Sequence, residues 1–359
     1  MGSKSSGKNI IFRFDYGGQI GRGHLSRCLS LAKAFKEAGR EPIFVIRKRP
    51  SIAEDKLPFR TIWLEEASDV VSADISCWIV ESVESEASEM LNILEPESIV
   101  ILDHYSLGFS WQQMLISKGH KLILFQDVFS ERFEADILIN YNFNAEELYS
   151  PAFTKARNTR FLLGPQYAPL ESVYKKEHSI SFQVNSKVEI IGIYLGGVEK
   201  KHLETLAGVI LGIEYFSNKE IHWVVSSEDE ENTLRTTLGF RNLQIHIRIP
   251  NLATFYEKAQ LFIGTCGVSL IERACLGMWQ INFIAADNQK DIANYIEQSR
   301  LGFVLGDIRS MNKGEIISKL TNALNLEDEN KMEPIQKCFS LVDGDGTSRI
   351  LKTFFEVGL

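Results

Sequence analysis

Short apolar runs alternate with longer segments of helical periodicity along the first half of the chain. Strand-like runs are found at 9–14, 42–47, 77–82, 98–105, 121–127 and 135–142. Between the first two runs, apolar residues recur at helical spacing, at Leu25, Cys28, Leu29, Ala32 and Phe35. Gly39 follows them as a helix stop. This alternation predicts a mostly parallel sheet that is covered by helices on both faces.

The same alternation begins again after a polar stretch. Two prolines at 164–174 precede the polar segment 175–187, which is typical of a linker. Later strand-like runs are found at 188–197, 221–227, 243–249, 261–267 and 281–286. Helices are expected at about 200–213 and through 272–277, and the stretch 343–357 is expected to be a turn that leads into a helix with an apolar face. We therefore predict two Rossmann-like domains, at 9–180 and 187–325, and a C-terminal helical segment at 326–359 that could pack back on the first domain.

Length and composition narrow the class of protein. A chain of 359 residues is too long for one ordinary core and fits two domains. The formal net charge of -8, from 39 basic and 47 acidic residues, argues against a nucleic-acid-binding protein, which would need a basic face. Five scattered cysteines form no C-x-x-C pair, so neither a disulfide framework nor a zinc knuckle is expected. No apolar run approaches the roughly 20 residues of a membrane span and the first eight residues are polar, which predicts a cytoplasmic protein.

The segment FDYGGQIGRGHLSRC at 14–28 places four glycines between a strand end and a helix start. Backbone N–H groups and the positive end of the helix can bind an anion there. His24 lies at the first helical turn, where the positive helix end disfavours imidazolium, so we expect a neutral ring that can accept a proton. Asp15 at the strand end could orient this imidazole. The alternative is a flexible turn followed by a histidine near a helix cap.

This loop is neither a standard dinucleotide loop nor a P-loop. Ser26 stands where the third glycine of a dinucleotide loop belongs, and Arg47 ends the next strand in place of an acid. The lysine of a P-loop is also absent from the segment.

Polar side chains follow several strand-like runs of the first half. They are Asp103, His104 and Tyr105 after one run, Gln126 and Asp127 after the next, and Asn140 and Asn142 after the last. Because the carboxyl ends of strands in an open parallel sheet face the ligand crevice, we expect these side chains to converge. Taken alone, each could be a helix cap or a loop residue.

Two glycine-containing loops follow strands of the second half. One contains Gly196 and Gly197, and the other is GTCGVSLIERACLG at 264–277. The second offers another helix N-terminus for a phosphate. Glu272 in that helix could accept hydrogen bonds from ribose hydroxyls, the alternative being a surface glutamate. No metal site is expected, because the histidines lack metal-ligand spacing and the DGDG stretch at 343–346 lacks the other ligands of a calcium loop.

With these motifs, the chain resembles the bacterial UDP-2,4-diacetamido-2,4,6-trideoxy-β-L-altropyranose hydrolases of pseudaminic acid biosynthesis. The matching elements are RFDYGGQIGRGHLSRCLSLA (13–32), LDHY (102–105), FQDVF with ADILIN (125–140), LLGPQYAPL (162–170), YLGG (194–197), IGTCGVSLIERACLGM (263–278) and DGDGTSR (343–349). The resemblance implies a GT-B-like α/β fold, with two Rossmann-like domains whose parallel sheets face a central cleft and UDP held mainly by the second. It also implies inverting hydrolysis at the anomeric carbon without metal or cofactor, which releases UDP and the free sugar.

The resemblance assigns roles to individual residues. His24 is implied as the base that activates water, Tyr105 lies by the sugar, and Glu272 binds ribose, while Asp15 is grouped with the catalytic residues. The other candidate substrate- and UDP-binding residues are Gly21, Gly23, Arg27, Asp103, His104, Asp127, Asn140, Asn142, Gly196, Gly197, Gly264, Cys266, Gly267, Val268 and Ser269. The chain departs from the family pattern at Gln126, Glu199 and His202, where aspartate, aspartate and asparagine are usual.

Three other functions stay open at this point. A GT-B glycosyltransferase would use the same UDP-sugar as donor, and the basic segment 47–49 would be its candidate membrane-docking patch. A UDP-sugar 2-epimerase cleaves the same bond, and a nucleotide-sugar-binding protein would keep the fold without activity. For all of them we expect a UDP-sugar ligand, no nucleic acid, no membrane span and a monomer.

Overall fold

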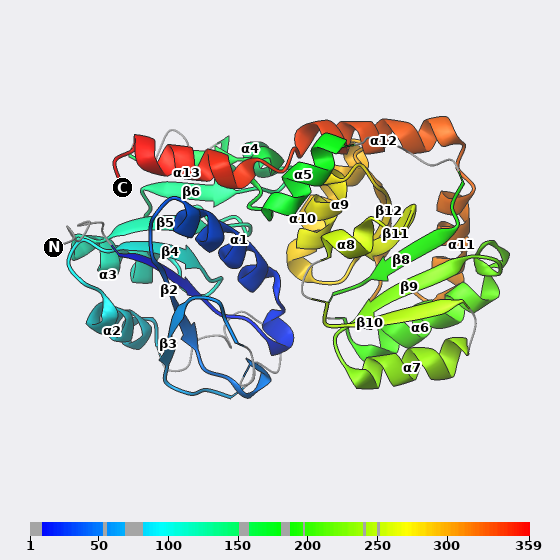
Figure 1. Cartoon of the computed structure of the whole chain (residues 1–359), viewed down its shortest axis with the longest axis horizontal. Helices are drawn as coiled ribbons and strands as arrows, with labels where there is room; N and C mark the ends of the chain where they lie inside the picture. Colours follow the sequence, from blue (N-terminus) through cyan, green and yellow to red (C-terminus); the bar gives the residue numbers. More distant parts are fainter. Residues whose placement is uncertain are drawn as a thin grey trace. The chain divides into compact units, whose positions relative to one another are not determined.

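The computed structural model describes residues 9–52, 56–68, 82–150, 158–180, 187–196, 198–239, 242–249 and 252–359. The chain divides into two compact units. Unit 1 is formed by Met1–Glu171 with Asp345–Leu359, and unit 2 by Ser172–Gly344. Each unit is a parallel sheet with helices on both faces (Figure 1). The predicted pair of Rossmann-like α/β folds is therefore confirmed.

The sheet of unit 1 has seven strands in the order β3-β2-β1-β4-β5-β6-β7. The strands are β1 (Ile10–Phe14), β2 (Pro42–Arg47), β3 (Arg60–Leu64), β4 (Ile99–Asp103), β5 (Lys121–Phe125), β6 (Ile137–Asn140) and β7 (Arg160–Leu163). The strand order reverses between β1 and β4, and Phe14 pairs with Asp103 in register. The carboxyl ends of these two strands thus lie side by side at the switch point, where open α/β sheets bind their ligands.

Helices cover both faces of this sheet (Figure 1). On one face lie α1 (Gly23–Glu37) and α13 (Gly346–Glu356), and on the other α2 (Val83–Ile93) and α3 (Phe109–Ser117), with the short α4 (Ala145–Tyr149) after β6. Strand alternation decides which side chains each face receives. Phe12 contacts Phe35 of α1, with ring centroids 6.2 Å apart, whereas Leu102 packs in the core under α2 and α3. Phe35 also contacts Phe354 of α13, at 4.8 Å.

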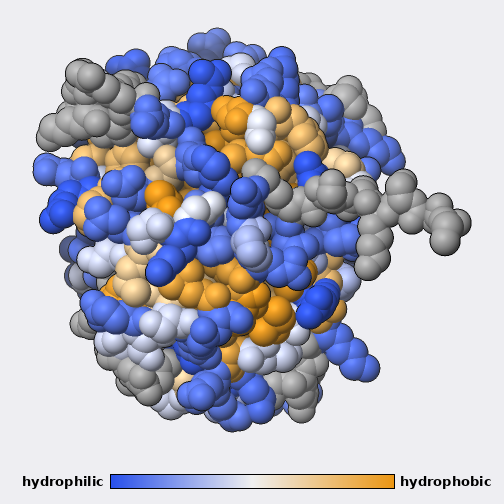
Figure 2. Space-filling model, turned by 90° about the vertical axis from the view of Figure 1, so that its left-hand side faces the viewer, coloured by the Kyte–Doolittle hydropathy of each residue, from blue (hydrophilic) through white to orange (hydrophobic). Residues whose placement is uncertain are grey.

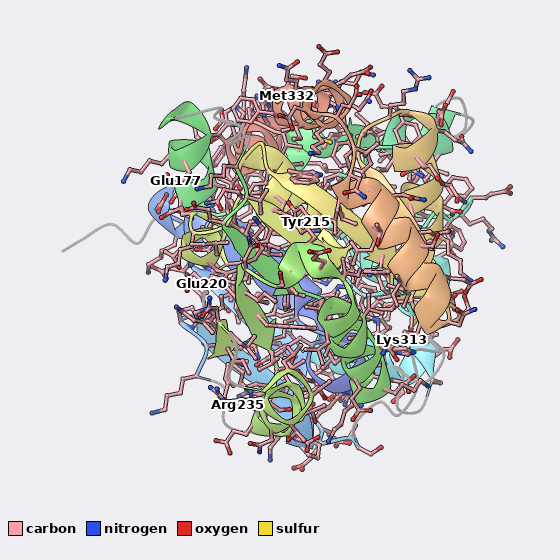
Figure 3. All side chains as sticks on the ribbon, turned by 90° about the vertical axis from the view of Figure 1, so that its right-hand side faces the viewer. Glu177, Tyr215, Glu220, Arg235, Lys313 and Met332 are labelled. Carbon is pink, nitrogen blue, oxygen red and sulfur yellow. The ribbon has the colours of Figure 1, made fainter. Side chains whose placement is uncertain are left out.

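The sheet of unit 2 has six parallel strands in the order β10-β9-β8-β11-β12-β13. They are β8 (Ile190–Tyr194), β9 (Glu220–Val225), β10 (Leu243–Ile247), β11 (Leu261–Thr265), β12 (Trp279–Ile284) and β13 (Phe303–Asp307). The helices are α5 (Ser172–Ile180), α6 (Lys200–Gly212), α7 (Glu228–Leu238), α8 (Ala253–Tyr256), α9 (Val268–Cys275), α10 (Lys290–Gln298), α11 (Lys313–Leu324) and α12 (Asp328–Leu341). Figure 3 faces this unit, with α6, α7 and α11 toward the viewer. Here the strand order reverses between β8 and β11, so the loops after these strands hold the second candidate site.

Several elements differ from the sequence-based expectations. The strands β3, β7 and β13 were not predicted, and the expected strand at 77–82 lies almost entirely outside the described residues. Part of the expected linker at 175–187 is helical, because α5 extends to Ile180 and buries Tyr174 among its polar residues. The two units meet in sequence at 171/172 and again at 344/345. The segment expected at 326–359 is therefore divided, with α12 in unit 2 and α13 in unit 1.

The described surface of unit 1 carries both hydrophobic and hydrophilic side chains. Figure 2 faces this unit and shows hydrophobic residues exposed between larger hydrophilic areas. No helix in the described ranges is long and apolar enough to cross a membrane.

Candidate functional site

His24 and Asp103 form a buried pair at the carboxyl edge of the unit 1 sheet. His24 is the second residue of α1, and Asp103 is the last residue of β4. Nδ1 of His24 lies 2.7 Å from Oδ1 of Asp103, and the histidine is only 4% exposed. Because Leu102 points to the opposite face of the sheet, alternation directs Asp103 toward α1.

Arg27, one turn further along α1, keeps this carboxylate ionised. It donates from Nε to Oδ2 of Asp103 at 2.6 Å and from Nη2 to Oδ1 at 2.5 Å. Burial alone would raise the pKa of Asp103, but the charge of Arg27 and the hydrogen bonds from Arg27 and His24 outweigh burial and hold that pKa well below its usual range.

The ionised carboxylate determines the tautomer of His24. A carboxylate can only accept hydrogen bonds, so Nδ1 of His24 must carry the hydrogen that it shares with Asp103. In the neutral ring, Nε2 is then the atom that can accept a proton. The 3.1 Å between Nη2 of Arg27 and Nδ1 of His24 arises because both atoms donate to the same oxygen.

Asp15 does not orient His24, so this part of the prediction is wrong. Its Oδ1 accepts from Nη1 of Arg13 at 2.5 Å and from the backbone N–H of Arg47 at 2.9 Å. Nε2 of His104 lies 3.4 Å from the other oxygen, Oδ2. Strand alternation explains the difference, because Asp15 follows Arg13 by two residues and shares its side of the sheet, away from α1. His104 is thus part of the Asp15 cluster rather than of the His24 cluster.

Tyr105 and Asp127 complete the cluster around His24. The hydroxyl of Tyr105 donates to Oδ2 of Asp127 at 2.9 Å, and its ring meets His24 edge-on with centroids 4.8 Å apart. Nη1 of Arg27 reaches the same Asp127 oxygen at 2.8 Å and the hydroxyl of Tyr141 at 2.7 Å. Tyr141 was missed by the sequence analysis, although its place directly after β6 was a signal for it. The guanidinium of Arg27 therefore joins the carboxylate at the end of β4 to the carboxylate that follows β5.

Asn140 and Asn142 shape the loop after β6. Oδ1 of Asn140 accepts the backbone N–H of Asn142 at 3.0 Å, and Nδ2 of Asn142 donates to the carbonyl of Asp127 at 3.1 Å. In the part of the chain that the structure describes, Nδ2 of Asn140 and Oδ1 of Asp127 are buried without a hydrogen-bond partner. A buried donor and a buried acceptor of this kind suit a bound ligand or ordered water.

The glycines of the first loop shape the entry to α1. Gly21 has a φ of 78°, which favours glycine, and its carbonyl accepts the N–H of Gly17 at 2.9 Å. Gly23 is the first residue of α1, immediately before His24.

The basic segment 47–49 is not a surface patch, so it does not serve as the membrane-docking feature considered for a transferase. Arg47 and Arg49 are buried, and Nη2 of Arg47 lies 2.9 Å from Glu86 and 2.6 Å from Glu89. Lys48 is exposed and pairs with a neighbouring glutamate. These arginines neutralise acidic side chains within unit 1 instead of presenting charge to a partner.

The second cluster lies where β11 joins α9 in unit 2. Gly267 caps α9, Val268 and Ser269 open it, and Cys266 is buried just before it. Glu272 is 7% exposed and accepts the hydroxyl of Tyr256 at 3.0 Å, so it is not a surface glutamate.

Other predicted residues of unit 2 lie apart from this turn. Gly196 follows β8 with a φ of 68°, and Gly197 lies outside the described residues. Glu199 pairs with Lys201 on the surface, and His202 is buried in α6. No group of three or more histidine, cysteine, aspartate or glutamate side chains in the described ranges could hold a metal ion.

Arg273 was missed by the sequence analysis. It follows Glu272 in α9, and its guanidinium is buried against the β11–α9 turn. Its partners are Gln280, Ser269, the carbonyl of Thr265 and Asn282. An arginine directly after the expected ribose-binding glutamate was the only signal in the sequence.

Comparisons with known proteins place the fold. No protein-family model and no curated protein sequence matches the chain. Solved structures with a similar fold include MurG of Acinetobacter baumannii (TM-score 0.63, 15% identity, 97% of this chain and 99% of that one). Os79 of O. sativa in complex with UDP has a TM-score of 0.66 at 14% identity (96% and 99%), and MnaA of S. aureus with UDP has 0.62 at 11% (96% and 95%). At such identities the likeness shows the fold alone, which is the two-domain GT-B fold that the resemblance implied.

Proposed function

We propose that this protein hydrolyses a UDP-linked sugar at the anomeric carbon, with His24 as the general base. The observation that carries the proposal is the His24–Asp103 pair, in which the ionised carboxylate leaves Nε2 as the proton-accepting atom. Its position at the switch point of the sheet agrees with a ligand site. The bound UDP of Os79 and MnaA, which share the fold, supports a nucleotide ligand.

The proposed reaction is a single displacement by water. The water oxygen bonds to the anomeric carbon, the bond from that carbon to the UDP oxygen breaks, and the electron pair leaves with UDP. The proton of the water passes to Nε2 of His24, and Asp103 stabilises the imidazolium that forms. General-base catalysis of this kind contributes about 10²–10⁴-fold to the rate.

Unit 2 would hold the nucleotide. The amides at the start of α9 and the positive end of that helix suit a diphosphate, and they would stabilise the negative charge that develops on the leaving UDP. Glu272 is fixed by Tyr256 and would accept hydrogen bonds from the ribose hydroxyls.

The sugar that we propose is a 2,4-diacetamido-2,4,6-trideoxy hexose, whose release would supply nonulosonic acid synthesis in the cytoplasm. The resemblance provides this identity. The unsatisfied donor of Asn140 and acceptor of Asp127 support it, because an acetamido group offers one acceptor and one donor.

The test is to incubate the purified full chain with the UDP-sugar and no acceptor, and to follow the products by NMR. We expect free sugar that is inverted at the anomeric carbon. The variant His24→Asn should lose turnover but keep its affinity for UDP. His120→Asn is the matched control, because His120 precedes β5 at the opposite edge of the same sheet.

Each rival function predicts a different outcome. A glycosyltransferase would leave the UDP-sugar intact until an acceptor is supplied and would then form a glycoside of that acceptor. A 2-epimerase would exchange the hydrogen at C2 with deuterium of the solvent. A binding protein would bind UDP and turn over none of the sugars tested. Near-normal turnover by His24→Asn would refute the assignment of His24 as the general base.

A further inference from the structure

Arg273 buries its positive charge without a carboxylate partner. Its exposed fraction is 0%. Its acceptors are all neutral, namely Oε1 of Gln280 at 2.9 Å, Oγ of Ser269 at 3.0 Å, the carbonyl of Thr265 at 3.1 Å and Oδ1 of Asn282 at 2.7 Å. Among the described residues, no aspartate or glutamate oxygen lies within ion-pair distance of it, and the neighbouring Glu272 is bound to Tyr256 instead.

This arrangement is costly for the folded chain. A buried charge is normally paired, because taking it out of water costs several kcal/mol that neutral acceptors only partly offset. The buried arginines of unit 1 follow the rule, since Arg13 contacts Asp15 and Arg27 contacts Asp103. The unpaired charge of Arg273 therefore calls for a reason beyond packing.

The guanidinium lies directly beneath the turn that joins β11 to α9. It bonds Thr265 before the turn and Ser269 after it. Gly264 leaves room for it, because a Cβ there would lie 2.6 Å from Nη1. Its charge also reaches the turn itself. Burial raises the pKa of the Cys266 thiol to about 12, and the charge of Arg273 opposes that rise.

The backbone of the turn offers hydrogen-bond donors at the same place. The amides of Gly267, Val268 and Ser269 open α9, and within the described residues the structure gives them no backbone acceptor. Such amides bind anions. A buried cation without a counter-charge and three N–H groups without a backbone acceptor in the described structure thus meet at one turn.

We propose that Arg273 is a positioning residue that makes this turn electropositive and sets its preference for a nucleoside diphosphate over the uncharged nucleoside. The inference rests on the proposed function, because it takes the nucleotide phosphates to lie at this turn. The guanidinium does not touch the ligand. It holds both ends of the turn by hydrogen bonds, and its charge acts through the turn in surroundings of low dielectric.

The sharpest test is Asn282→Asp. This substitution keeps the side-chain shape and the acceptor 2.7 Å from Arg273, and it removes Nδ2 of Asn282, which is buried without a partner in the described structure. The new carboxylate pairs with the guanidinium and neutralises its charge. We expect UDP affinity to fall about tenfold while uridine affinity changes less than about twofold, as measured by isothermal titration of the full chain at low ionic strength.

Two substitutions of Arg273 separate charge from shape. Arg273→Lys keeps the charge but loses the planar fork, so the UDP-over-uridine preference should largely survive. Arg273→Met removes the charge, and this preference should fall about tenfold, as in Asn282→Asp, because the amides of the turn remain. Arg235→Gln is the control for net charge, because Arg235 lies on the outer face of α7 and pairs with Glu231 (Figure 3). It should leave both affinities unchanged, and thermal melts establish that each variant is folded.

The outcomes separate the two proposals. If folded Asn282→Asp binds UDP as tightly as the unmodified chain does, the role of Arg273 is refuted. If Arg273→Met loses UDP and uridine affinity to the same degree, Arg273 only shapes the turn, and the role is also refuted. If the unmodified chain does not bind UDP more tightly than uridine, the proposed nucleotide site itself fails and this inference falls with it.

Discussion

Replacing Asp103 with asparagine would test the catalytic pair most directly, because the change removes a charge while it keeps the side-chain volume. The carboxylate accepts two hydrogen bonds from Arg27, at 2.6 and 2.5 Å, and one from His24, at 2.7 Å. An amide has one oxygen to offer these three donors, and its NH₂ group would face the others. The variant Asp103→Asn therefore breaks a buried ion pair and also releases the constraint on the His24 tautomer.

The two effects have separate magnitudes. Removing one partner of a buried ion pair costs about 3–5 kcal/mol of stability. We expect the lower end, about 3 kcal/mol, because Arg27 keeps its contact with Asp127 at 2.8 Å. Turnover should fall by about 10²–10⁴-fold, since neither the tautomer nor the imidazolium of His24 is then stabilised.

The stability difference should also depend on pH. The pKa of Asp103 is held well below its usual range in the fold, so its ionisation stabilises the native state fully above its unfolded pKa of about 4. That contribution is lost as the pH falls through the folded pKa. The gap in unfolding free energy between the unmodified chain and Asp103→Asn should narrow as the pH falls below about 4.

The assay is a cycle of Asp103→Asn, His24→Asn and the double variant, each measured for turnover and for urea unfolding. Residues that act as one unit are strongly non-additive in turnover, so the double variant should be no slower than His24→Asn alone. If the losses multiply, or if Asp103→Asn turns over within about fivefold of the unmodified chain, the pair does not work as the geometry suggests.

Three further results are expected. Tyr105→Phe loses the 2.9 Å bond to Asp127 but keeps its ring, so turnover measured under saturating substrate should fall about tenfold while Tm changes little. Gly264→Ala places a methyl group 2.6 Å from the Arg273 guanidinium, which should cost about 1–3 kcal/mol in urea unfolding of unit 2. The ion pair of Asp15 holds its pKa below the ordinary value, against the effect of burial. The contribution of Asp15 to stability, measured as the difference in unfolding free energy between the unmodified chain and Asp15→Asn, should therefore be present above about pH 4 and be lost as the pH falls below that value.

The sequence predicted the fold where its apolar runs and helical periodicity were clear. The strand–glycine–helix sequences around His24 and Glu272 predicted β1–α1 and β11–α9, because buried parallel strands are continuous apolar runs and the helices that follow are periodic. Elements with weaker patterns were missed. The edge strand β3 is partly exposed and includes Arg60, and α5 is mostly polar and buries Tyr174, so packing rather than composition decides their structure.

Convergence at the strand ends was also predictable, but the pairing within it was not. Asp15 and Asp103 both end up beside the switch point, and the sequence alone gave no reason to prefer one as the partner of His24. Which aspartate pairs with His24 depends on the side of the sheet that α1 covers and on the alternation of side chains along β1 and β4. Tyr141 and Arg273 were missed for a related reason, because each acts through a partner that is distant in sequence or on another element.

The two clusters bury an arginine in opposite ways, and the proposed chemistry explains why. Arg27 is balanced by Asp103 and Asp127, and without those carboxylates its charge would oppose the imidazolium that His24 must form when it takes a proton. Arg273 has only neutral partners, and a carboxylate beside it would cancel the charge that favours a diphosphate at the adjoining turn. A site that generates a cation during the reaction thus needs an adjacent arginine to be neutralised, whereas a site that receives an anion needs it left unpaired. A double variant with Asp103→Asn and Asn282→Asp would reverse both arrangements. Its losses of proton transfer and of phosphate affinity should be independent of each other, because each substitution acts on a different unit of the chain.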